Sequence, residues 1–163
     1  MLKKICEDER IFVAGSRGMV GSSVCRMLKK QGYGDIKKGG RIFTPTRHEL
    51  DLLDIIKVRD WFRFNKPTVV IVAAAKVGGI FANSNFPADF ILENIKIQTN
   101  IIETSWQENV KRLLFLGSNC IYPRNANQPL KEEYLLNGEL EKTNEWYSIS
   151  KISGLKLCQA LRI

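Results

Sequence analysis

Short apolar runs alternate along this chain with segments of helical periodicity. Four runs predict strands over Arg10–Ala14, Arg41–Thr44, Thr68–Ala74 and Arg112–Leu116. Apolar residues three or four apart predict helices over Met19–Gln31, Ile55–Phe64 and Pro87–Glu108 and from Asn144 onward. The third run, TVVIVAA, is too uniformly apolar for either face to meet water, which is typical of a parallel sheet covered by helices. The order predicts a doubly wound α/β fold with ligands at the carboxyl ends of the strands.

The charge balance limits the kinds of partner. The 163 residues, the length of one domain, include 25 basic and 17 acidic residues, and the formal net charge of +8 favours an anionic partner. Nucleic acid, an acidic membrane and a phosphorylated small molecule all meet this description. The basic residues are dispersed and form no arm, so we expect no nucleic-acid partner.

The N-terminal segment and the cysteines bear on location and on metals. The segment MLKKICEDERIFVAG lacks the apolar core of a signal peptide, and no segment approaches the length of a membrane span. The four cysteines stand far apart without a CxxC pair, and His48 is the only histidine. We therefore expect a protein of the reducing cytoplasm with no membrane partner and no metal site.

The motif GSRGMVG follows the first predicted strand and opens the first predicted helix. It consists of Gly15, Ser16, Arg17, Gly18, Met19, Val20 and Gly21. Glycines allow a tight turn, close approach to a pyrophosphate and packing of helix on strand, while helix N–H groups attract phosphate. The spacing GxxGxxG departs from the GxGxxG of ordinary dinucleotide-binding dehydrogenases. Three glycines alone also fit a plain turn, but the flanking strand and helix favour phosphate binding.

The segment TPTRH follows the second predicted strand, where an NAD site usually places a carboxylate for the ribose 2′-hydroxyl. Arg47, together with Arg17, can instead bind a 2′-phosphate through charge-assisted hydrogen bonds, which favours NADP(H) over NAD(H). The alternative is that both arginines are ordinary surface residues. We expect His48 to be a surface neighbour and not a catalyst.

Tyr147 and Lys151 stand four residues apart in the last predicted helix, in the sequence YSISK. Residues at this spacing share a helix face, so the Lys151 ammonium can lower the pKa of the Tyr147 phenol toward neutrality. Such a tyrosine can deliver a proton to a carbonyl oxygen as hydride arrives at the carbon. The pattern alone also fits a surface pair, and it gains specificity from the glycine motif and from Ser118 at the end of the fourth strand.

Several blocks of the chain resemble one known family. The blocks GSRGMVG, AAAKVGGI, FPADFILEN, LGSNCIYP, KTNEWYSISK and GLKLC lie between Ile11 and Leu161 and resemble the GDP-L-fucose synthases. These enzymes are extended short-chain dehydrogenases/reductases. The resemblance covers essentially the whole chain, and AAAKVGGI and SNCIYP separate this family from other nucleotide-sugar enzymes.

The resemblance implies an NADPH-dependent enzyme that epimerises GDP-4-dehydro-6-deoxy-D-mannose at C3 and C5 and reduces C4 in one site. It implies that Tyr147 is the proton donor in reduction, with Lys151 as its pKa partner and a ribose ligand. Ser118 is then the donor to the C4 oxygen. Cys120 matches the acid/base of epimerisation, since the C4 carbonyl acidifies the neighbouring C–H bonds. The alternative for Cys120 is an inert structural cysteine.

The cofactor residues implied by the resemblance extend beyond the glycine motif. The pyrophosphate is expected at Gly15–Gly21 and the 2′-phosphate at Arg17 and Arg47. The remaining expected cofactor positions are Asp51, Leu52, Ala73, Ala75, Leu116, Gly117, Ser118, Asn119 and Lys151. The segment from Lys76 to Gly79 is expected along the path of the substrate.

The length of the chain departs from that of the family, whose members continue well beyond Ile163 with further strands, a histidine that pairs with the cysteine, and a GDP-sugar domain. We expect residues 1–163 to form an incomplete NADP-binding Rossmann domain without the substrate-binding domain, and the fourth strand to be an open apolar edge. The full-length family implies a homodimer through the helices at Pro87–Glu108 and from Asn144 onward. A complementing C-terminal piece is a further expected partner.

Three functional hypotheses remain open. The chain is the N-terminal portion of a fucose synthase that needs further residues, a non-catalytic NADP-binding remnant, or part of a sister epimerase or dehydratase for another nucleotide sugar. The joint presence of Tyr147, Ser118, Cys120 and Lys151 favours the first hypothesis. The cysteine disfavours the third, and nucleic-acid binding through charge alone ranks last.

Overall fold

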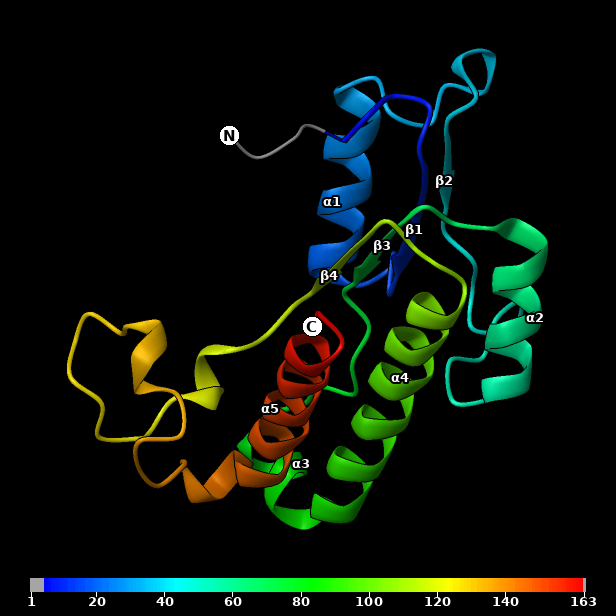
Figure 1. The fold of residues 1–163 in the computed structure, drawn as a ribbon. Helices are drawn as coiled ribbons and strands as arrows, with labels where there is room; N and C mark the ends of the chain where they lie inside the picture. Colours follow the sequence, from blue (N-terminus) through cyan, green and yellow to red (C-terminus); the bar gives the residue numbers. More distant parts are fainter. Residues whose placement is uncertain (1–4, 163) are drawn as a thin grey trace. The chain divides into compact units, whose positions relative to one another are not determined.

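The computed structural model describes residues 5–162 (Figure 1). Its helices and strands are β1 (Arg10–Ala14), α1 (Met19–Lys30), β2 (Arg41–Phe43), α2 (Ile55–Asn65), β3 (Val69–Val72), α3 (Ile80–Asn85), α4 (Pro87–Gln107), β4 (Arg112–Phe115) and α5 (Glu145–Ala160). Short 3-10 helices are η1 (Ile36–Lys38), η2 (Asn119–Ile121), η3 (Glu132–Tyr134) and η4 (Lys142–Asn144). Two compact units are present, one running to Ala74 and including Asn100–Leu116, the other holding Ala75–Thr99 and the chain from Gly117.

The first unit contains a parallel sheet with the strand order β2-β1-β3-β4. In the register, Phe12 of β1 lies between Phe43 of β2 and Val70 of β3. The chain places β2 on one side of β1 and β3 on the other, so the sheet has a topological switch point between β1 and β3. Open α/β sheets bind ligands outside the carboxyl ends of the strands at such a point. The four predicted strands and the Rossmann-type fold are confirmed.

Helices cover both faces of this sheet (Figure 1). One face presents a buried cluster that packs against α1 and is formed by Ile11, Val13, Val69 and Ile71. On the opposite face the ring of Phe12 lies 4.6 Å from that of Trp61 and 5.7 Å from that of Phe62, both in α2. Successive residues of β1 thus point to opposite faces, and both faces are dry.

Local signals in the sequence explain where the helices begin and end. The Asp54 carboxylate accepts hydrogen bonds from the backbone N–H groups of Ile56 and Lys57, at 3.0 and 3.1 Å, and so caps α2. Lys66, with φ of 44°, ends that helix before Pro67. Pro87 opens α4, where the missing proline N–H costs nothing.

The strand β4 forms an open edge of the sheet within the described residues. Its side chains alternate between exposed and partly buried, and Leu114 is 53% exposed. In the strand order of the described sheet, β4 is last and has β3 as its neighbour. The predicted apolar edge at the fourth strand is therefore confirmed.

The second unit joins the first part of α4 to α5. The buried Gln98 amide nitrogen donates to the Ser150 carbonyl oxygen at 2.6 Å and to the Ser153 hydroxyl oxygen at 2.9 Å. Within this unit η2 lies against α5, and η4 lies against α3. The sequence did not predict α3, because six residues are too few to show helical periodicity.

Within residues 5–162, every helix is too short or too polar to cross a lipid bilayer.

Candidate functional site

The glycine turn lies at the carboxyl end of β1 in the first unit. Gly15 has a φ of +78°, and a Cβ there would come within 2.7 Å of the backbone of Ala73 and Ala74. A Cβ on Gly21 would lie 2.1 Å from the Gly15 carbonyl oxygen. The same addition at Gly18 would make only an ordinary contact of 3.4 Å. Packing within the chain therefore requires the first and third glycines, whereas the backbone at the second lies open.

The amino end of α1 follows directly from this turn. The Gly18 N–H donates to the Gly15 carbonyl oxygen at 3.0 Å, and the Ser22 N–H donates to the Gly18 carbonyl oxygen at 2.9 Å. A helix leaves its first N–H groups without intrahelical partners, and its dipole makes this end attractive to anions. Met19 and Val20 hold exposed side chains there. The turn has the chemistry of a phosphate site.

A second turn, after β2, carries Arg47. The Glu49 carboxylate accepts from the Thr46 N–H at 2.6 Å, and the Glu49 N–H donates to the Thr46 hydroxyl at 3.3 Å. Hydrogen bonds from the Thr46 backbone and side chain hold the pKa of the Glu49 carboxyl below its usual value, and the charge of Arg17 lowers it further. Arg17 is thus close enough to the turn that contains Arg47 for its charge to act on Glu49. Both arginines are exposed. The sequence prediction did not include Glu49, although the Thr-x-x-Glu capping pattern is a signal for it.

The remaining predicted cofactor positions of the first unit sit in turns and strand ends. The Asp51 carboxylate accepts from the Leu53 N–H at 3.1 Å, and the Leu52 carbonyl accepts from the Asn100 amide at 2.9 Å. The Ala73 N–H donates to the Ala14 carbonyl at 3.0 Å, beside the glycine turn. Leu116 continues the β4 ladder onto Val72. His48 is exposed.

In the second unit, Ser118, Cys120 and Tyr147 come together. Ser118 precedes η2, and its hydroxyl oxygen accepts from the Cys120 N–H at 3.3 Å. The Tyr147 side chain, on the first turn of α5, is hydrogen-bonded to Ser118 and lies close enough to Cys120 to feel its charge. Two segments that the sequence predicted separately, the end of the fourth strand and the last helix, thus form one cluster.

The protonation of Tyr147 differs from the prediction. Burial raises the pKa of Tyr147, the hydrogen bond with Ser118 opposes that rise, and the Cys120 charge adds to it. The Lys151 ammonium lies 6.0 Å from the Tyr147 ring centroid, and burial lowers the pKa of Lys151. The predicted lowering of the tyrosine pKa by Lys151 is therefore wrong for this chain. The periodicity showed which residues share a helix face, but desolvation depends on the packing around that face.

Cys120 has a hydrogen-bond donor that the sequence did not predict. The Asn144 amide nitrogen donates to the Cys120 sulfur across 3.2 Å. The buried Ser148 hydroxyl lies 3.0 Å from the Asn144 carbonyl oxygen and 3.4 Å from its side-chain oxygen. Asn144 is the residue before α5, three positions from Tyr147, and only the adjacency of η2 and α5 reveals its contact with the cysteine.

The segment after β3 is held by α4. The buried Asn94 side chain accepts from the Lys76 N–H at 2.7 Å and donates to the Lys76 carbonyl at 3.0 Å. The Lys76 ammonium pairs with Glu93 at 2.5 Å and with Asp89 at 3.6 Å. The hydrogen bond with Glu93 raises the pKa of Lys76. Lys76, which we expected along the substrate path, is thus anchored through both its backbone and its charge.

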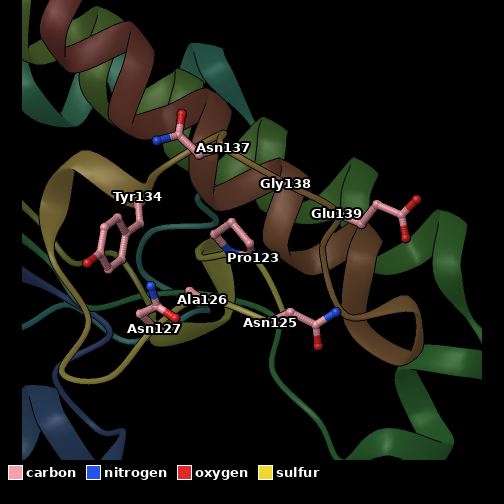
Figure 2. Close-up of a pocket in the computed structure, with 8 residues that line it drawn as sticks. All are labelled: Pro123, Asn125, Ala126, Asn127, Tyr134, Asn137, Gly138 and Glu139. Carbon is pink, nitrogen blue, oxygen red and sulfur yellow. The ribbon is translucent and has the colours of Figure 1, made fainter.

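A hollow of about 350 Å³ lies in the connection between η2 and α5, apart from the cluster of Ser118, Cys120 and Tyr147 (Figure 2). Its lining residues are Pro123, Asn125, Ala126, Asn127, Tyr134, Asn137, Gly138 and Glu139. The side chains of Asn137 and Glu139 carry their polar groups away from Pro123 (Figure 2). The hollow contains none of the predicted site residues.

The predicted site residues thus form two groups. The first unit holds the glycine turn, Arg47, Asp51, Leu52, Ala73 and Leu116; the second holds Ala75, Gly117, Ser118, Asn119, Cys120, Tyr147 and Lys151. Among residues 5–162, the His, Cys, Asp and Glu side chains form no group of three that could hold a metal ion.

Known proteins share both the sequence and the fold of this chain. GDP-L-fucose synthase 1 from Arabidopsis thaliana is 53% identical over 157 residues, 96% of this chain and 47% of that protein. GDP-L-fucose synthase from Escherichia coli (strain K12) is 51% identical over 152 residues, 93% of this chain and 46% of that protein. A solved GDP-D-glycero-L-gluco-heptose synthase from Campylobacter jejuni, in the presence of NADPH, is 37% identical with a TM-score of 0.89, covering 97% of this chain and 45% of that one.

The predicted resemblance to the GDP-L-fucose synthases is confirmed by these relatives. This chain spans about half the length of the curated relatives it matches. A family match extends over residues 11–162, from β1 to the end of α5. The chain therefore belongs to the NAD dependent epimerase/dehydratase family.

Proposed function

We propose that this chain is the N-terminal portion of an NADP(H)-dependent GDP-L-fucose synthase. Its substrate is GDP-4-dehydro-6-deoxy-D-mannose, which is epimerised at C3 and C5 and reduced at C4. The observation that carries the proposal is the cluster in which Ser118, Cys120 and Tyr147 interact, with Lys151 beside the Tyr147 ring. The names of relatives 53% and 51% identical support it.

The residues of the first unit fit a dinucleotide. The open backbone at Gly18 and the amino end of α1 suit a pyrophosphate, and Arg17 and Arg47 suit a 2′-phosphate. Asp51, Leu52, Ala73 and Leu116 are proposed to line the rest of the site in this unit, and Ala75, Gly117, Asn119 and Lys151 in the other. The bound cofactor supplies the hydride for reduction at C4.

In the reduction, Tyr147 delivers a proton to the C4 oxygen. Because burial raises the pKa of Tyr147, its phenol is protonated at neutral pH and is a donor. Ser118, hydrogen-bonded to that phenol, holds the same oxygen. Lys151, whose ammonium lies 6.0 Å from the centre of the Tyr147 ring, is a ribose ligand in this proposal.

In the epimerisation, Cys120 exchanges a proton with the carbons next to the C4 ketone. A thiolate takes the proton, the electron pair of the C–H bond enters the enolate, and the carbon is reprotonated on its other face. The Asn144 amide, 3.2 Å from the sulfur, stabilises the thiolate. The proton for the other face comes from a donor outside these residues.

Location and assembly are also part of the proposal. We infer a cytoplasmic enzyme that forms a homodimer in its full length, and a C-terminal piece that completes the substrate site.

A second candidate is a sister reductase acting on another GDP-linked sugar. The 37% identical solved structure is named as a synthase of a GDP-linked heptose, and it covers 97% of this chain. The two candidates share the cofactor. They differ in the sugar and in the demand for epimerisation, which Cys120 serves.

Two measurements test the proposal. The chain is titrated with NADPH and with NADH, and we expect tighter binding of NADPH. The chain is then assayed for GDP-L-fucose formation alone and after fusion to the residues of the Escherichia coli relative that lie beyond the matched region. Product from the fusion, lost on Tyr147→Phe, supports the proposal. Failure to bind NADPH defeats the cofactor assignment, and binding without turnover in any combination favours a non-catalytic remnant.

A further inference from the structure

The side-chain amides of Asn144 and Asn119 both hydrogen-bond with the sulfur of Cys120, the first as a donor and the second as an acceptor. The Asn144 nitrogen donates to the sulfur at 3.2 Å, whereas the thiol donates to the Asn119 side-chain oxygen at 3.6 Å, a length that the large sulfur atom allows. We propose that Asn119 is a positioning residue that holds the thiol proton of Cys120, opposing Asn144, which stabilises the thiolate. The inference rests on the proposed role of Cys120 as the acid/base of epimerisation.

The opposition follows from which form of the sulfur each amide can bind. An acceptor oxygen binds the S–H group and gains nothing from a thiolate, whose lone pairs it repels. A donor N–H binds both forms, and it binds the charged form more strongly. Asn119 therefore favours the thiol, and Asn144 favours the thiolate. An acid/base that must both take and return a proton uses both forms.

Asn119 also connects the two halves of the proposed chemistry. The Ser118 hydroxyl donates to the same Asn119 oxygen at 3.4 Å. Ser118 is in turn hydrogen-bonded to Tyr147. One carboxamide oxygen thus accepts hydrogen bonds from both the Ser118 hydroxyl and the Cys120 thiol.

The neighbouring groups are consistent with the sense of each amide. The Ser148 hydroxyl lies on the oxygen side of the Asn144 carboxamide, so the nitrogen of that group faces the sulfur. Asn119 has two donors, the Ser118 hydroxyl and the Cys120 thiol, and its oxygen is the atom that meets them. Asn119 is exposed, so its side chain can be replaced without opening the core.

The test is the rate at which iodoacetamide alkylates Cys120 at one slightly alkaline pH. Only the thiolate reacts, and peptide mass spectrometry separates Cys120 from the other three cysteines. Asn119→Leu and Asn144→Leu replace each amide by an apolar group of similar size, which keeps the steric shielding of the sulfur. We expect about threefold faster alkylation for Asn119→Leu and about threefold slower alkylation for Asn144→Leu, the effect of one weak hydrogen bond.

Two further variants sharpen the result. Asn119→Asp keeps an acceptor oxygen, so its alkylation is expected at or below the rate of the unaltered chain. Asn137→Leu is the matched control, because the Asn137 amide donates to the Glu133 carbonyl at 2.7 Å instead, and we expect no change. Equal or same-direction changes for Asn119→Leu and Asn144→Leu overturn the inference.

If Asn144→Leu fails to fold, as judged by circular dichroism, the comparison of Asn119→Leu with Asn119→Asp decides alone. Faster alkylation in the first and not in the second supports the inference, and any other order overturns it. Alkylation needs neither cofactor nor sugar. Its outcome is therefore separate from that of the NADPH and GDP-sugar measurements.

Discussion

The carbonyl oxygen of Gly15 lies so close to the α-carbon of Gly21 that a methyl group on Gly21 would come within 2.1 Å of it. This contact joins the first turn of α1 to the end of β1. Gly18, between them, has its nearest such neighbour at 3.4 Å. Gly15 and Gly21 are therefore required for packing, whereas Gly18 leaves the backbone open.

We expect Gly21→Ala to lower the free energy of unfolding by about 2 kcal/mol or more, because the neighbouring backbone cannot give way. Gly18→Ala should leave the free energy of unfolding within about 0.5 kcal/mol and weaken NADPH binding, since its methyl group would enter the open space. Urea unfolding and NADPH titration measure the two effects. A Gly21→Ala chain as stable as the unaltered one would show that the contact is not a constraint.

The cap of α2 gives a second stability prediction. Asp54→Ala removes the acceptor for two backbone N–H groups, and we expect it to cost about 1 kcal/mol. Asp54→Asn keeps an acceptor and should cost less. Asp60→Ala, on the same helix with only a long 3.9 Å ion pair to Arg63, is the control. Equal losses for Asp54→Ala and Asp60→Ala in urea unfolding would argue against the cap.

The burial of Lys151 predicts a pH dependence of stability. Its folded pKa is lowered, so below the unfolded value of about 10.4 the unfolded chain binds more protons, and stability rises with pH between the folded and unfolded values. Lys151→Met should remove that rise. Thermal unfolding from neutral to alkaline pH checks this. A variant that shows the same alkaline rise would place its origin elsewhere.

The two hydrogen bonds between the Asn94 side chain and the Lys76 backbone predict a loss of stability when Asn94 is replaced. Asn94→Leu leaves the Lys76 N–H and carbonyl without the partners they have now, and we expect a loss of about 2 kcal/mol. Asn85→Leu is the matched control, because the Asn85 amide makes one exposed bond to Phe81. The comparison uses urea unfolding of the two variants. Similar losses from both would contradict the special role of Asn94.

The helices and strands that bury an apolar face could be predicted from the sequence. The observed β1 has the predicted bounds, and α4 ends one residue before its predicted end. These elements can be recognised in the sequence because burial of one face gives their apolar residues a regular spacing. The helix α3 could not be found in this way, because its six residues are too few to show helical periodicity. The Asn83 side chain holds it by hydrogen bonds to the backbone of Gly78 and Gly79.

The candidate site was predictable as a set of residues but not as a set of interactions. The sequence placed Tyr147 and Lys151 on one helix face, and the structure has them together. The sequence could not show that burial raises the pKa of Tyr147. Nor could it show the contact between Asn144 and Cys120, because residues 24 positions apart in the chain meet only through the packing of η2 on α5.

The position of β4 at the end of the strand order has a consequence for handling the protein. Backbone groups at the edge of a sheet can pair with another strand, whatever its side chains. Loss of material through this edge requires two copies to meet, so its initial rate should grow with the square of the concentration. Diluting a sample tenfold should then lengthen its half-life about tenfold, a behaviour that light scattering over time can distinguish from first-order decay.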